Sequence, residues 1–162
     1  MKIEIGKFNI GYIGSNFQEH FGSEEVKPKK CKLEFRVLEK SMNDKEILAE
    51  LKPQEVTLNE FVYILEHDKD LLKNGYTNIF YIRDKNGTLW AVSACWGGVD
   101  RGWDVDAYSV ASPFEWSAGS RVFSQSFSSG TLEPSALGSD LEARVKELEN
   151  DMRKIRKFLV LG

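Results

Sequence analysis

The feature that most constrains this chain is an unbroken heptad repeat near its C-terminus. Apolar residues recur there at spacings of 4, 3, 4, 3 and 4, at Leu141, Val145, Leu148, Met152, Ile155 and Leu159. In the heptad, Val145, Met152 and Leu159 take a positions, and the other three take d positions. An isolated helix of about 22 residues is marginal in water because nucleation is costly. The repeat therefore predicts a coiled-coil helix over residues 139–161 that buries its apolar stripe against other copies of the chain.

The charges that flank this stripe predict the orientation of the helices. In a parallel coiled coil, a g residue faces the e residue five places further along the neighbouring helix. Arg144 then faces Glu149, and Asp151 faces Arg156, so both pairs attract. In an antiparallel arrangement, Glu149 of one helix approaches Glu149 of the other. Exposed pairs contribute only about 0.2–1 kcal/mol each, so these charges select a parallel orientation while burial supplies the affinity.

The number of helices is less constrained than their orientation. Valine at a with leucine at d favours a dimer. Residues 144–149, RVKELE, are similar to the Arg-h-x-x-h-Glu motif of short parallel trimeric coiled coils, and this resemblance implies a trimer. We expect a homotrimer, with a homodimer as the next possibility. A helix that packs back onto its own body remains an alternative. The expected oligomer interface consists of Leu141, Arg144, Val145, Leu148, Glu149, Met152, Ile155 and Leu159.

The rest of the chain divides into a body over residues 1–125 and a Ser/Gly-rich linker over residues 126–138. Apolar residues make up 41% of the chain and aromatic residues 12%, which fits a packed core and excludes a disordered chain. A formal net charge of −3 gives no strong nucleic-acid signal. Two cysteines are too few for a disulfide-stapled secreted domain. Neither a signal peptide nor a transmembrane run is found, so a cytoplasmic location is expected.

Hydrophobic periodicity predicts an α+β body, an antiparallel β-sheet with one main packed helix. The helix begins after a capping box at Thr57 and Glu60 and runs from 58 to 68. Residues 45–51 fit either a helix or a strand, and residues 14–30 are expected to be a solvated loop. Strands are expected over 3–12, half-buried at 33–37, over 79–83, 89–96 and 103–110, and at an edge over 121–123. A hairpin turn is expected at 84–87.

Alternation within two of these strands separates a core face from an outer face. Trp90, Val92 and Ala94 share one face of their strand, and Trp103, Val105 and Ala107 share the helix-facing side of the next. Asp104, Asp106 and Tyr108 then point the other way.

The same region supplies the candidate ligand platform, which consists of Trp96, Trp103, Tyr108, Trp116, Asp104 and Asp106. Exposed aromatic rings stack on sugars or bases, and paired carboxylates can share a proton or bind a hard cation. The alternative is that the rings fill a core and the carboxylates decorate an exposed strand. His20 and His67 have no cysteine or histidine at ligand spacing, so no metal site or cofactor is expected.

Two segments carry a resemblance to a known family: residues 74–96, NGYTNIFYIRDKNGTLWAVSACW, and residues 103–124, WDVDAYSVASPFEWSAGSRVFS. Together with GYIGSNFQEHF and ILAEL, they resemble a family of proteins without a known activity that recurs in small uncultured, candidate-phylum bacteria. The resemblance covers about residues 5–124. It implies one natural domain with the coiled coil appended, and it implies no activity, cofactor or catalytic residue.

These observations predict a non-enzymatic, self-associating binding or assembly protein, whose partner is an unidentified protein or glycan. One alternative is a glycan- or nucleic-acid-binding module that uses exposed aromatics. A weaker alternative is a carboxylate-dependent hydrolase that uses Asp104 and Asp106.

Overall fold

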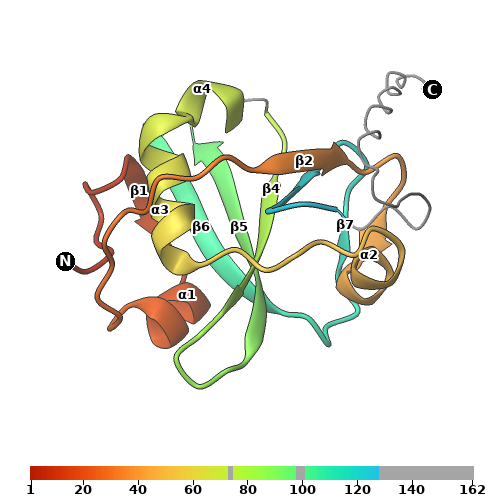
Figure 1. The fold of residues 1–162 in the computed structure, drawn as a ribbon, viewed down its shortest axis with the longest axis horizontal. Helices are drawn as coiled ribbons and strands as arrows, with labels where there is room; N and C mark the ends of the chain where they lie inside the picture. Colours follow the sequence, from red (N-terminus) through yellow and green to blue (C-terminus); the bar gives the residue numbers. More distant parts are fainter. Residues whose placement is uncertain (73–74, 98–100, 128–162) are drawn as a thin grey trace, which may run out of the picture. The chain divides into compact units, whose positions relative to one another are not determined.

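The computed structural model describes residues 1–72, 75–97 and 101–127 (Figure 1). These residues belong to a single unit, Met1–Phe127. The predicted helix over 139–161 and linker residues 128–138 lie outside the described residues. All eight residues of the expected oligomer interface lie outside them as well. Among the described residues, no helix is both long and apolar enough to span a membrane.

The centre of the unit is a six-stranded sheet in the order β1-β6-β5-β4-β8-β2, beside a two-stranded β3-β7 ribbon. The strands are β1 (Ile10–Ile13), β2 (Glu34–Val37), β3 (Met42–Asn43), β4 (Asn78–Arg83), β5 (Leu89–Gly97), β6 (Gly102–Ser109), β7 (Glu115–Trp116) and β8 (Arg121–Ser124). The helices are α1 (Ser15–Phe21), α2 (Asp44–Glu50), α3 (Leu58–His67) and α4 (Lys69–Leu72).

The α+β class is confirmed, but the prediction of a wholly antiparallel sheet is wrong. The β4–β5, β5–β6 and β2–β8 pairs are antiparallel, whereas β1–β6 and β4–β8 are parallel. Only a few residues separate β4 from β5 and β5 from β6 in the sequence, so the antiparallel meander follows from local sequence. Both parallel pairs join segments far apart in the chain, which local alternation cannot reveal. For the same reason β8, which was expected at an edge, lies between β4 and β2.

The helix at 58–67 is confirmed with its capping box. The Thr57 hydroxyl accepts from the Glu60 N–H, and a Glu60 carboxylate oxygen accepts from the Thr57 N–H at 2.9 Å. Residues 44–50 form α2, which has its own capping box at Asn43 and Glu46. Within the described part of the chain, the main helix is thus accompanied by three shorter ones.

The expected loop at 14–30 is wrong in its first part, where α1 forms. Phe17 and Phe21, four residues apart, are both completely buried, and their ring centroids lie 5.1 Å apart. This apolar pair docks α1 on the core although its other residues are mostly polar. The expected strand over 3–12 is reduced to β1, because the chain turns at Phe8 and Asn9, which have positive φ. The expected half-burial holds for Leu33, which packs against the first core, but is wrong for 34–37, because all four residues of β2 are exposed.

Two hydrophobic cores lie on opposite faces of the sheet. The first, which α1 and α3 cover, contains the predicted helix-facing residues Val92, Ala94, Trp103, Val105 and Ala107, with Trp90 packed against it. The second lies beneath α2 and the β3-β7 ribbon and contains Ile47 and Trp116. β4 contributes to both, because Phe80 and Ile82 enter the first core while Ile79 and Tyr81 enter the second.

Candidate functional site

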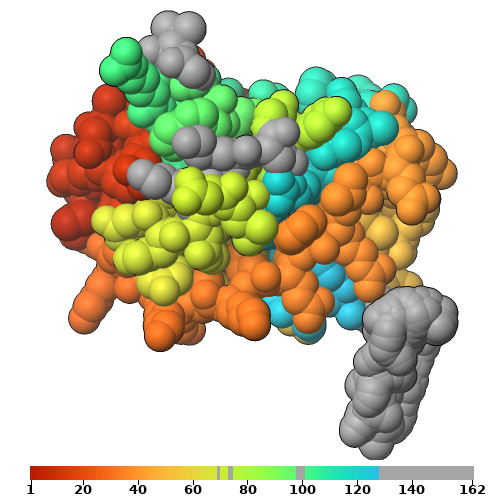
Figure 2. All heavy atoms as spheres, turned by 90° about the horizontal axis from the view of Figure 1, so that it is seen from above, coloured from red at the N-terminus to blue at the C-terminus, as the bar shows by residue number. Residues whose placement is uncertain are grey.

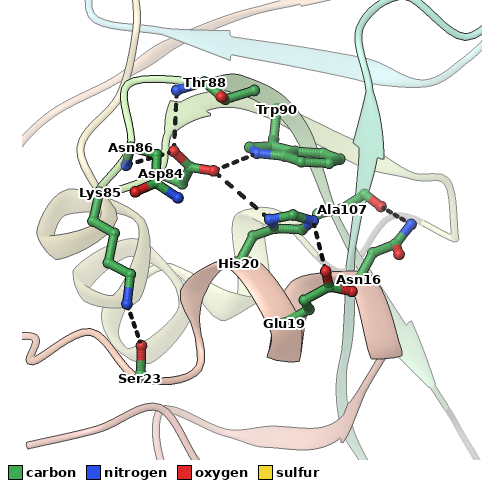
Figure 3. Close-up of polar contacts among 10 residues, drawn as sticks. All are labelled: Asn16, Glu19, His20, Ser23, Asp84, Lys85, Asn86, Thr88, Trp90 and Ala107. Atoms are coloured by element: carbon green, nitrogen blue, oxygen red, sulfur yellow. Dashed lines mark hydrogen bonds and ion pairs between the residues drawn. The ribbon is translucent and has the colours of Figure 1, made fainter.

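The β4–β5 turn holds a buried carboxylate that sequence reasoning did not select (Figure 3). One Asp84 oxygen accepts the backbone N–H groups of Asn86 and Thr88 at 2.8 and 3.0 Å. The other oxygen accepts from Trp90 Nε1 at 2.9 Å. Gly87 takes the positive φ of 85° that this hairpin turn requires, as the sequence predicted. The turn therefore positions the Asp84 side chain, which is only 3% exposed.

His20 of α1 completes this site from a distant part of the sequence. Its Nδ1 atom lies 3.7 Å from an Asp84 carboxylate oxygen, and its ring lies over that of Trp90 with centroids 4.0 Å apart. Glu19 approaches Nε2 of the same ring at 3.9 Å. Figure 3 shows the imidazole between these two carboxylates, with α1 on one side and the turn on the other.

The electrostatics of this site favour the charged form of Asp84. Burial by itself raises the pKa of the carboxyl, but hydrogen bonds from Trp90, Thr88 and Asn86 and the nearby His20 outweigh it, so the pKa lies below its ordinary value. Within the described residues, no serine or cysteine is hydrogen-bonded to the His20 ring. The Ser23 hydroxyl instead accepts from the Lys85 ammonium group at 3.0 Å. The arrangement therefore joins α1 to the β4–β5 turn.

The residues of the predicted ligand platform do not lie together on one exposed surface. Trp103 is completely buried in the first core, where its Nε1 donates to the Leu65 carbonyl at 3.0 Å, and Trp96 contacts it edge-on. Trp116 is 4% exposed and belongs to the second core, where it contacts Tyr108 edge-on. The four rings are thus divided between the two faces of the sheet, and two of them are core residues.

Asp104 and Asp106 lie two residues apart on β6, and each is half-buried beside a glycine. A Cβ at Gly14 would lie 2.2 Å from the Asp106 carboxylate, and a Cβ at Gly97 would lie 2.9 Å from that of Asp104. Asp106 also accepts from the Ala107 N–H at 2.8 Å. Burial, aided by the Asp106 charge, raises the pKa of Tyr108. Close packing thus holds both carboxylates in place.

A second buried carboxyl, Asp44, lies at the start of α2 and is completely inaccessible to solvent. One of its oxygens accepts from the Tyr81 hydroxyl at 2.7 Å and from Trp116 Nε1 at 2.8 Å. Its other oxygen is buried without a hydrogen-bond partner among the described residues. Burial raises the pKa of Asp44, although both donors favour its charged form. No sequence signal distinguishes this residue, because an acidic side chain in the first turn of a helix is ordinary.

Cys31 is a free, half-buried cysteine next to α3. Burial, together with nearby Glu60 and Asp68, raises the pKa of the Cys31 thiol to about 11. Cys31 is therefore a neutral thiol near pH 7 and a poor nucleophile. In residues 1–72, 75–97 and 101–127, no three His, Cys, Asp or Glu side chains gather where they could hold a metal ion.

The comparisons with known proteins assign no family to this site. No family model, no curated protein and no solved structure matches the chain.

Proposed function

We propose that the protein is a non-enzymatic, self-associating binding or assembly protein. Segment 139–161 forms a parallel coiled coil, with three chains favoured over two, and each chain presents one copy of the body. The observation that carries this proposal is the uninterrupted heptad with complementary e and g charges. Presenting several bodies together converts weak contacts into avidity without any new contact in the single body.

The test measures the molar mass of the full-length chain in solution. Leu148→Glu with Ile155→Glu places two charges in the d positions, and light scattering at about 10–50 µM compares this variant with the wild-type chain. We expect three chains per particle for the wild type and one for the variant, because charges in the seam prevent its burial. The matched control, Asn150→Glu with Lys157→Glu, adds the same residues at outward f positions and keeps the wild-type mass. A wild-type chain that is monomeric in this range contradicts the proposal.

Orientation is tested by a charge exchange between g and e positions. Arg144→Glu brings two acidic residues together in a parallel assembly and weakens it, and adding Glu149→Arg restores attraction. A restored mass in the double variant supports the parallel arrangement. A double variant that remains as weak as the single one contradicts it.

A further inference from the structure

β2 forms one edge of the six-stranded sheet and is exposed along its whole length. It pairs with β8 on one side, and no other described strand pairs with it. Phe35 and Val37 are 38% and 52% exposed, although both are apolar. In Figure 2 the orange part of the chain, which contains β2, crosses this side of the molecule at its surface. An exposed apolar edge strand is a template for pairing with another strand.

The register shows which backbone groups of β2 are available. Residues 34 to 37 lie opposite 124 to 121, and the Leu38 N–H donates to the Ser120 carbonyl at 2.8 Å in the same register. Because hydrogen-bonded pairs alternate along an antiparallel ladder, Glu34 and Arg36 bond to β8. The N–H and C=O groups of Phe35 and Val37 then point to the open edge. They take part in no hydrogen bond with side chains or loops among the described residues.

The side chains of β2 separate by chemistry between the two faces of the sheet. The Phe35 ring lies against the buried Phe123 ring, with their centroids 5.4 Å apart, and Phe123 belongs to the first core. The odd-numbered residues of β2 therefore lie on the face of the first core. The Arg36 guanidinium lies 4.8 Å from the centre of the Phe127 ring, which packs against the second core. One face of the open edge therefore carries Phe35 and Val37, with the Arg121 guanidinium of β8 4.9 Å from the centre of the Phe35 ring, and the other face carries the charged side chains of Glu34 and Arg36.

We propose that this edge is an interface with a second copy of the chain. The segment Leu33-Glu34-Phe35-Arg36-Val37 has the same pattern read from either end, apart from the opposite signs of its two charges. In antiparallel pairing centred on Phe35, Glu34 of each copy lies opposite Arg36 of the other, and Leu33 lies opposite Val37. Opposite charges and apolar pairs directly across two strands stabilise the pairing.

The charges also exclude the neighbouring registers. A shift of two residues in one direction places Glu34 opposite Glu34, and a shift in the other direction places Arg36 opposite Arg36. Like charges directly opposite each other destabilise a pair of strands. A shift of one residue brings the apolar face of one copy onto the charged face of the other. The result is a two-fold symmetric contact that continues the sheet from one copy into the next.

This interface is separate from the coiled coil and goes beyond the proposed function. The contact involves about five residues a side, fewer than the 20–30 of a standard interface, so by itself it is weak. If three chains are joined by the proposed coiled coil, each chain still has its own β2 edge. Pairing of that edge with the β2 edge of a chain in another trimer would link one trimer to the next. Neither interface depends on the other, so each can be tested in the absence of the other.

The first experiment exchanges the two charges in the full-length chain that also carries Leu148→Glu and Ile155→Glu. Sedimentation equilibrium from about 10 µM to 1 mM measures dimerisation. Glu34→Arg and Arg36→Glu each turn both cross-strand pairs from attractive to repulsive, and we expect about tenfold weaker dimers. The double exchange restores dimerisation, and so does mixing the two single variants. No dimer in the unexchanged chain at 1 mM, or equal affinities for all variants, overturns the proposal.

The second experiment tests the register by disulfide cross-linking. In the proposed pairing, the Cα atoms of the two Phe35 residues lie about 5.5 Å apart, within the range of a disulfide. The Cα atoms of the two Val37 residues lie about 14 Å apart, because they are offset by four residues along neighbouring strands. Mild oxidation therefore cross-links Phe35→Cys and not the matched control Val37→Cys, with the unsubstituted chain reporting the background from Cys31 and Cys95. Equal cross-linking at both positions, or none at either, overturns the register.

These experiments separate the two proposals. A wild-type chain that is monomeric at low concentration, with Phe35→Cys still cross-linking at high concentration, contradicts the coiled coil and supports the β2 contact. A trimer with no cross-link does the reverse. A chain whose own residues after 127 cover the edge gives no cross-link and overturns the β2 contact.

Discussion

Replacing Asp44 tests how a buried carboxyl stabilises the second core. The Tyr81 hydroxyl and the Trp116 N–H both donate to the same Asp44 oxygen, at 2.7 and 2.8 Å. Asp44→Ala leaves both donors unpaired, and each buried unpaired donor costs about 1–3 kcal/mol. We therefore expect the free energy of unfolding to fall by about 2–6 kcal/mol. Asp44→Asn keeps an acceptor oxygen for both donors but places an amide NH2 group where the second oxygen has no partner among the described residues, so it should be destabilising but less so than Asp44→Ala.

The pH dependence of this effect has a definite sign. Because burial raises the pKa of Asp44, the folded protein holds the proton more tightly than the unfolded chain does. This contribution to stability is complete below the unfolded pKa, about 3.8, and is lost as the pH rises through the folded pKa. The free energy of unfolding of the wild type minus that of Asp44→Asn should therefore decrease as the pH rises.

The assay is urea unfolding of the full-length chains between pH 4 and 8, followed by tryptophan fluorescence at one fixed protein concentration. Taking the difference between two variants cancels the other titrating groups, and the fixed concentration keeps any association constant. A difference that stays level or increases with pH would refute the reasoning, as would an Asp44→Ala variant as stable as Asp44→Asn.

Three further predictions use thermal or urea unfolding. His20→Phe keeps a ring over Trp90 and should cost less than His20→Ala, which loses about 0.5–1.5 kcal/mol of ring packing; equal losses would argue against it. Gly102→Ala places a Cβ 2.7 Å from backbone atoms of residues 9 and 11, so the β1–β6 pairing should weaken and stability should fall by about 3 kcal/mol. Thr57→Ala removes the cap that accepts from the Glu60 N–H and should cost about 1 kcal/mol; an unchanged midpoint would contradict this.

The predicted parts of the fold are those in which neighbours in sequence are neighbours in space. The turn at 84–87 and the capping box at Thr57 carry their hydrogen bonds within a few residues, and the structure confirms both. The core faces of β5 and β6 follow from alternation over a single strand. Helix α1 was missed because its apolar signal is reduced to two residues, Phe17 and Phe21, in an otherwise polar segment.

The parts that could not be predicted depend on contacts across long stretches of chain. His20 and Asp84 are 64 residues apart, and neither has a neighbour in sequence that indicates the other. Asp44 meets Trp116 from 72 residues away. The tryptophan-rich strands showed that large rings were present, but exposure depends on what covers them. The sequence pattern therefore allowed Trp103 and Trp116 to be either ligand-binding rings on the surface or core residues. In the structure both are buried in the cores.

The parallel pairing of β1 with β6 has a consequence for the order in which the chain folds during its synthesis. The first strand lies opposite residues 103–105, which a ribosome adds about 90 residues later, or about 5–20 s at ordinary elongation rates. Until then Ile10 and its neighbours have no partner strand, although the β4–β5 hairpin can form as soon as it emerges. Folding of the nascent chain should therefore begin with the β4–β5 hairpin, then add β1 once β6 has emerged, and finish when β8 emerges and pairs with β4 and β2.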